Sequence, residues 1–165
     1  APQRIHRLLP DAKLIVLLRD PVERALSQYF HSRRLGLEPL PLEQAFQAEV
    51  DRLSSGEMVH LQEHSYVSRS RYVEQLDRYL NLFPEQQMLV LQSETLFGDP
   101  TATWRQIEAF LGLPQAPSPA AAPKANAGQG EARAVTAGIR RDLRKQLKAT
   151  ALGVRERFGF GWDWA

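Results

Sequence analysis

The chain has 165 residues, of which 43% are hydrophobic and 24% are charged, a balance typical of one globular domain that buries a core. Its formal net charge of +2 is too small to indicate nucleic-acid binding by itself, and an anionic small ligand fits it equally well. The absence of cysteine excludes a disulfide framework, thiolate-bound zinc and a cysteine nucleophile, but it does not identify the compartment.

The longest aliphatic run, Leu14 to Leu18, is far shorter than the roughly 20 apolar residues that span a bilayer, so we expect a soluble protein with no membrane span in this segment. Residues 13–19 lack polar alternation and predict a strand buried on both faces in a parallel sheet. The preceding APQRIHRLLPDAK has neither an initiator methionine nor a signal pattern, and we expect the sequence to be a piece of a longer protein.

A well-specified helix is expected directly after this strand. Asp20 is a good N-cap, Pro21 suits the first helical position, and Glu23 lies three residues after the cap, as in a capping box. Gly36 is expected to end the helix after two arginines. The apolar stripe of this helix comprises Val22, Ala25, Leu26, Tyr29 and Phe30.

Helices and strands then alternate along the chain. We expect a helix that ends at SSG, a helix over about residues 70–82, and a second buried strand over 87–94. Asp99, Pro100 and Gly112 repeat the cap, start and stop of the first helix. The helix that ends at SSG is expected to bury Leu42, Phe46, Val50 and Leu53. This alternation predicts an α/β layer architecture with parallel strand pairing.

The last third of the chain has a different composition. Residues 114–130 are rich in proline, alanine and glycine without periodicity, so we expect a flexible loop or linker inside a single domain over residues 1–165. A basic helix over about 131–150 and the aromatic tail RFGFGWDW follow. Core packing, rather than base stacking, is expected for the aromatic residues at helical spacing, Tyr72, Tyr79, Trp104 and Phe110.

Arg19 stands where ligands bind in open parallel α/β sheets, beyond the end of a strand and against a helix N-terminus whose free N–H groups favour anions. Its guanidinium can hold a phosphate through two parallel hydrogen bonds. Ser27 follows about 10 Å along the helix axis, beside Glu23 and Arg34 and off the apolar stripe. The pair predicts a phosphate clamp, and the residues alone leave open a salt-bridged Arg19 and a solvated Ser27.

The stretch KLIVLLRDPVERALSQYFHSRR resembles the 3′-phosphate-binding element of sulfotransferases that use 3′-phosphoadenosine 5′-phosphosulfate (PAPS). That element is a buried strand, Arg, Asn or Asp, Pro, and a helix with serine eight residues after the arginine, positions that Arg19 and Ser27 match. Residues 70–114 are similar to the helix, strand, acidic turn and helix that follow in bacterial and heparan-sulfate-type sulfotransferases. The resemblance covers about residues 1–113, with a weaker similarity in the closing RFGFGWDW.

The resemblance implies a P-loop-kinase-like α/β fold, incomplete at its N-terminus, and transfer of a sulfuryl group from PAPS to a hydroxyl or amine of a glycan or small-molecule acceptor. Arg19 and Ser27 would anchor the cofactor's 3′-phosphate, and no metal is needed. His31, one turn beyond Ser27, matches a histidine of the heparan-sulfate N-sulfotransferase branch and is a candidate acceptor-binding residue; a surface histidine is the alternative. The expected partners are the nucleotide and the acceptor, without nucleic acid, and the expected location is the cytoplasm.

The family's other essential element does not occur in this sequence. There is no GxxKxGT-like loop for the 5′-phosphosulfate, and the lysines lie in other settings: Lys13, Lys124, Lys145 and Lys148. In the family that loop and most general bases precede the arginine-bearing strand, so we expect the catalytic residues upstream of Ala1 and the chain alone to be inactive. Ser93 replaces a tyrosine that lies near adenine in many relatives. Around Lys124, PKANAGQG is a candidate for the basic loop over the 3′-phosphate, with a linker as the alternative.

Two further patterns carry weaker hypotheses. Residues 60–64, HLQEH, formally match the HxxEH zinc-peptidase pattern, but the preceding SSGEMV favours a loop and no third-ligand helix follows. IRRDLRKQLK is basic on one face and could attract a polyanion such as a sulfated glycan or a nucleic acid, or be a solvated face.

Two alternatives to a sulfotransferase stay open on the sequence. One is a truncated, non-catalytic nucleotide-binding or interaction module that retains only the 3′-phosphate clamp. The other is an unrelated nucleotide or phosphometabolite enzyme in which an arginine at a strand end is coincidental.

Overall fold

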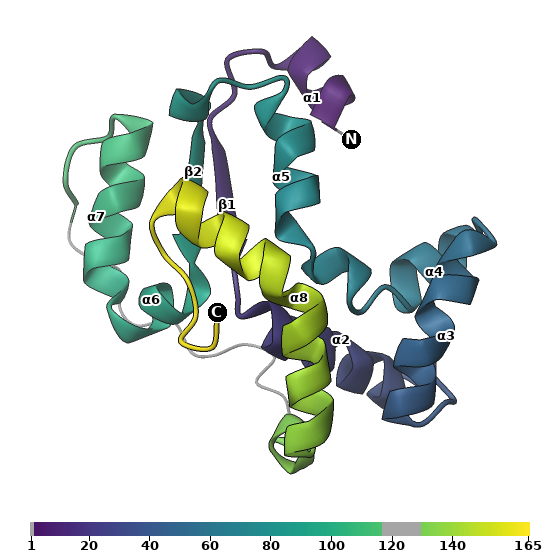
Figure 1. The fold of residues 1–165 in the computed structure, drawn as a ribbon. Coiled ribbons are helices and arrows are strands. Elements are labelled where there is room, and N and C mark those ends of the chain that lie inside the picture. The colour runs from purple at the N-terminus through teal and green to yellow at the C-terminus, as the bar shows by residue number, and fades with distance from the viewer. Residues whose placement is uncertain (1, 117–129) are drawn as a thin grey trace. The chain divides into compact units, whose positions relative to one another are not determined.

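The computed structural model describes residues 2–116 and 130–165. It shows a mixed α/β chain whose helices accompany a small parallel sheet (Figure 1), the class that the alternating pattern predicted. The chain divides into two compact units, one comprising residues 1–19 and 73–125 and the other residues 20–72 and 126–165. Within the described residues, no helix is both long enough and apolar enough to cross a membrane.

The first unit is built on two parallel strands, β1 (Leu14–Leu18) and β2 (Met88–Gln92), in a register that places Leu14 opposite Met88. Both strands lie inside their predicted ranges. The predicted burial of β1 on both faces is wrong, because Ile15 and Leu17 are 42% and 46% exposed. Alternate residues of a strand share one face, and this face of β1 stays open. The helical elements of this unit are α1 (Pro2–Leu8), α5 (Tyr72–Leu80) apart from its first residue, η2 (Glu85–Gln87), α6 (Ser93–Gly98) and α7 (Pro100–Leu111).

The start and the end of α7 are determined by local residues, as predicted. The Asp99 side chain accepts a hydrogen bond from the N–H of Ala102 at 2.9 Å, Pro100 opens the helix, and Gly112 ends it with a φ of +73°. The predicted acidic turn after β2 is instead the short helix α6, which begins at Ser93 inside the range predicted as strand.

The second unit is helical. Its elements are α2 (Pro21–Arg34), α3 (Leu42–Ser54), α4 (Met58–Glu63), η1 (Ser68–Ser70), η3 (Glu131–Ala134) and α8 (Ala137–Phe158). The basic helix predicted over 131–150 begins later because Thr136 caps α8, accepting from the N–H of Ile139 at 3.4 Å, while η3 forms a separate turn. Figure 1 shows α8 alongside α2 within this unit.

The core of the second unit gathers around the predicted stripe of α2. Val22 and Leu26 pack with Leu143 and Leu147 of α8, whereas Ala25 and Tyr29 of α2 belong to a neighbouring cluster. Phe30, the remaining member of the stripe, packs against both clusters.

The predicted inward face of α3 is partly wrong. Val50 is 70% exposed, whereas Ala45 and Glu49 are buried. The carboxylate of Glu49 accepts hydrogen bonds from the N–H groups of Val67 and Ser68 at 2.9 and 2.8 Å. Because buried backbone donors need acceptors, the side of α3 that carries Glu49 faces inward and Val50 faces out.

Candidate functional site

The start of α2 is fully capped by its own N-cap residue. The N–H groups of Val22 and Glu23 donate to Oδ1 of Asp20 at 2.8 and 3.1 Å. The N–H of Arg24 donates to the Asp20 carbonyl at 2.8 Å, and Pro21 has no N–H. The predicted N-cap role of Asp20 is confirmed, and its two oxygen acceptors leave no N–H of the first turn for a ligand. An anion here must be held by side chains, with only the helix dipole in support.

The aromatic tail closes over the same carboxylate. Nε1 of Trp164 donates a hydrogen bond to Oδ2 of Asp20 at 2.6 Å. The guanidinium of Arg144, on α8, lies 5.9 Å from the centre of the Trp164 ring, within the range of a cation–π contact. Both oxygens of Asp20 are thus engaged. No local pattern in the sequence pairs this tail with Asp20.

Ser27 is exposed on α2 between two ion pairs that tie this helix to the segment around α8. One turn before it, Glu23 pairs with Arg140 of α8. Beyond it, Nη1 of Arg34 lies 3.2 Å from Oε1 of Glu131 in η3. The carboxylate assigned to a capping box therefore also binds a cation on another helix, so the acid nearest to Ser27 along α2 is neutralised.

The two residues of the predicted clamp, Arg19 and Ser27, are both exposed. Arg19 follows β1 directly and is exposed, and His31 is exposed in the last turn of α2, one turn beyond Ser27. Arg19 belongs to the first unit, whereas Ser27 and His31 belong to the second. Convergence of Arg19 and Ser27 on one phosphate stays a prediction, as does an acceptor-binding role for His31.

Two further sequence hypotheses concern Ser93 and the loop around Lys124. Ser93 opens α6 and donates to its neighbour Glu94 at 3.2 Å, so the hydroxyl already has an acceptor. Lys124 and most of the predicted flexible loop, residues 117–129, lie outside the described residues.

A buried carboxylate that no sequence pattern singles out organises the loop after α2. Glu38 is 1% exposed and accepts from Arg52 through Nη1 at 2.6 Å and Nη2 at 3.2 Å. The Tyr66 hydroxyl and the N–H of Leu40 donate to it at 2.6 and 2.9 Å. Burial raises the pKa of Glu38, but these hydrogen bonds outweigh burial and lower the pKa to about 2. Glu38 is therefore an ionised structural residue.

The first four residues of HLQEH lie in the short helix α4, and His64 follows the end of this helix, so the segment is not part of a long helix. The Nδ1 atoms of His60 and His64 are 3.1 Å apart, and Nε2 of His64 lies 3.2 Å from the Leu37 carbonyl oxygen. In the portion of the chain that the structure describes, no group of three or more His, Cys, Asp or Glu side chains is arranged to hold a metal ion.

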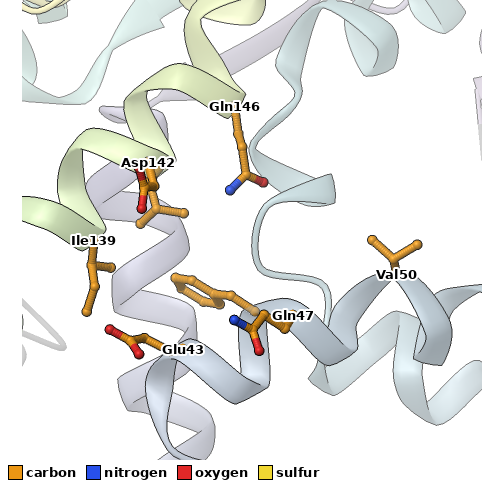
Figure 2. A pocket seen from close by; sticks show the side chains of 8 residues that line it. Glu43, Gln47, Val50, Ile139, Asp142 and Gln146 are labelled. Carbon is orange, nitrogen blue, oxygen red and sulfur yellow. The ribbon is translucent and has the colours of Figure 1, made fainter.

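A groove of about 510 Å³ lies between α3 and α8 in the second unit (Figure 2). Glu43 and Asp142 contribute carboxylates to its lining, and Gln47 and Gln146 contribute amides. None of the predicted site residues lines this groove, and its two acids make it unsuited to a phosphate.

Residues 4–125 match the family of the sulfotransferase domain. The chain belongs to the sulfotransferase family. It is 36% identical over 113 residues to human heparan sulfate glucosamine 3-O-sulfotransferase 6, a match that covers 68% of this chain and 31% of that protein. Human bifunctional heparan sulfate N-deacetylase/N-sulfotransferase 2 is 33% identical over 114 residues, which cover 68% of this chain and 13% of that protein.

The fold of this sulfotransferase chain is also that of a solved family member. A sulfotransferase from Alicyclobacillus acidocaldarius superimposes with a TM-score of 0.76 at 24% identity, covering 99% of this chain and 61% of that one. The similarity confirms the predicted P-loop-like α/β fold. The chain spans about a third or less of the heparan sulfate relatives named above.

Proposed function

We propose that this chain is the 3′-phosphate-binding part of a sulfotransferase that transfers a sulfuryl group from PAPS to a hydroxyl or amine of a glycan or small-molecule acceptor. The observation that carries this proposal is the order strand, exposed Arg19, capped helix and exposed Ser27, in a chain of this family. A cytoplasmic location stays a prediction.

The donors present suit a phosphate ester. Arg19 offers two parallel N–H groups and Ser27 offers a hydroxyl, so together they can bind several oxygens of one dianion. The neighbouring acids do not oppose this binding: Asp20 is held by α2 and Trp164, and Glu23 is paired with Arg140. When bound, PAPS supplies the activated sulfuryl group.

The part of these residues in the reaction is positioning. A 3′-phosphate held at Arg19 and Ser27 would fix one end of the nucleotide and so keep the sulfur in register with the acceptor. His31, one turn further along α2, would lie toward the acceptor and orient its nucleophile. We place the general base and the 5′-phosphosulfate loop outside residues 1–165.

The acceptor class is supported by the relatives. Their names describe sulfation of heparan sulfate, at a glucosamine oxygen in one and with an N-sulfotransferase activity in the other. A glucosamine-containing glycan is therefore the first acceptor to test.

The test is binding of adenosine 3′,5′-bisphosphate by calorimetry to the wild-type protein and to Arg19→Ala. Loss of a charge-assisted bidentate contact should weaken binding by about 10- to 100-fold. Equal affinities would remove the clamp. A parallel assay of sulfuryl transfer from PAPS to N-deacetylated heparosan tests whether residues 1–165 suffice for catalysis. We expect binding without transfer, and transfer would overturn our placement of the general base outside these residues.

A further inference from the structure

We propose that one face of α8 is a docking surface for an anionic polysaccharide acceptor. The α8 cationic face, as we name it, comprises Arg141, Arg144, Lys145 and Lys148. This inference rests on the proposed function and deepens it, because it assigns the acceptor to the class of acidic glycans.

Helical periodicity gathers the four cations on one side of α8. They occur at i, i+3, i+4 and i+7, and all four side chains are exposed. The opposite side of the helix is buried: Leu143 and Leu147 pack into the core of the second unit, and Ala151 and Val154 are buried as well. Arg141 and Lys148 are seven residues apart, which is about 10 Å along the axis. The α8 cationic face is therefore a compact row of positive charge directed away from the core.

In the described part of the chain, the cations of this face lack the carboxylate partners that other arginines of the unit have. Arg34, Arg52 and Arg140 each form an ion pair with a glutamate. Within residues 2–116 and 130–165, no carboxylate forms an ion pair with any member of the α8 cationic face. The acid in this part of the helix, Asp142, instead lines the groove toward α3 together with Glu43 (Figure 2). The two signs of charge are thus separated on α8, which leaves a strong field for a polyanion.

A glycan suits this surface better than a single-stranded nucleic acid does. Single-stranded nucleic acids are held by aromatic side chains on which the bases stack, and residues 137–148 of α8 contain no aromatic residue. The nearby Trp164 has its ring under Arg144 and its N–H on Asp20. A sulfated or carboxylated polysaccharide needs only a row of cations, and the named substrate of the relatives, heparan sulfate, is such a polymer.

The experiment measures binding of a heparin-derived decasaccharide to the protein at several NaCl concentrations, without nucleotide. The test variant is R141Q/K145Q/K148Q, and Arg144 is retained because it contacts Trp164. The control variant, R4Q/R7Q/R78Q, removes the same number of exposed cations from the first unit. Far-UV circular dichroism establishes that both variants are folded.

We expect the test variant to bind at least about tenfold more weakly than wild type near physiological salt, and its slope of log affinity against log salt to fall by about two to three. The control should change by less than about twofold. Equal losses in both variants would show a dependence on net charge alone and overturn the proposal, as would no loss in either. Equal competition by single-stranded DNA of matched charge would overturn the glycan assignment.

This measurement is separable from the test of the proposed function. The test variant retains Arg19 and Ser27, so its affinity for adenosine 3′,5′-bisphosphate should equal that of wild type. If the wild-type protein does not bind the nucleotide, the proposed function is overturned. If it binds the nucleotide but the substitutions of the test variant do not weaken decasaccharide binding, only the docking surface is overturned.

Discussion

The indole N–H of Trp164 donates a 2.6 Å hydrogen bond to Oδ2 of Asp20, the residue that caps α2 and directly follows Arg19. The two residues are 144 positions apart in the chain. Because Oδ1 of Asp20 already accepts from two backbone N–H groups, the tail holds the remaining carboxylate oxygen in one orientation. The end of the chain therefore stabilises the beginning of the helix that carries Ser27.

Trp164→Phe retains an aromatic ring under Arg144 but removes the donor to Asp20. We expect the free energy of unfolding to fall by about 1.5 to 3 kcal/mol, the value of a hydrogen bond to a charged group. Urea denaturation followed by circular dichroism measures this change. Trp104→Phe, at a half-buried tryptophan of α7, controls for loss of indole area. A loss in the Trp104 variant as large as that in the Trp164 variant would contradict a specific role for the N–H.

Ser27→Ala should weaken binding of adenosine 3′,5′-bisphosphate by about 3- to 10-fold. Its melting temperature should stay near that of wild type, because the side chain is exposed. Calorimetry gives the affinity, and Ser54→Ala, an exposed serine of α3, is the matched control. If the two variants bind the nucleotide equally well, Ser27 is not part of the clamp.

Arg140→Gln leaves the carboxylate of Glu23 without its cation, one turn before Ser27. The uncompensated negative charge should then repel a bound phosphate dianion and weaken nucleotide binding by about threefold, with a larger effect at low salt because screening is weaker there. The double variant Glu23→Gln/Arg140→Gln should restore affinity, since the repelling charge is gone. Absence of this rescue would show that Arg140 acts through packing rather than charge.

Glu38→Gln should be strongly destabilising, by about 3 kcal/mol, because it leaves the largely buried guanidinium of Arg52 without its charged partner. Glu43→Gln, at an exposed glutamate of α3, should change stability by less than about 0.5 kcal/mol. Urea midpoints of both variants at pH 7 test this difference. Equal midpoints would show that the charge of Glu38 does not contribute to stability and that its network stabilises the fold through packing alone.

The same carboxylate predicts a pH dependence of stability. The pKa of Glu38 is lowered from 4.5 to about 2 on folding, so below pH 4.5 the unfolded chain binds this proton more readily than the folded chain does. Its contribution of roughly 3 kcal/mol is fully present above about pH 5 and is lost as the pH falls toward 2. Wild type should therefore approach Glu38→Gln in stability between pH 5 and 2. A constant difference between the two over this range would contradict the assignment.

The sequence by itself determined the features that depend on near neighbours in the chain. The starts of α2 and α7 were predictable because Asp20 and Asp99 cap N–H groups two or three residues away. The positions of Arg19 and Ser27 relative to a strand and a helix followed from the same local signals and from the family pattern. The order of strands and helices, and hence the fold class, came from hydrophobic periodicity.

Only the tertiary structure decided which distant residues meet. The bond from Trp164 to Asp20, the pair of Arg140 with Glu23, and the burial of Glu38 join elements that no local pattern relates. The outward position of Val50 has the same origin, because the burial of Glu49 depends on N–H groups of another segment. Periodicity reports how a segment alternates between polar and apolar residues, whereas partners for buried charges are set by the packing of the whole chain.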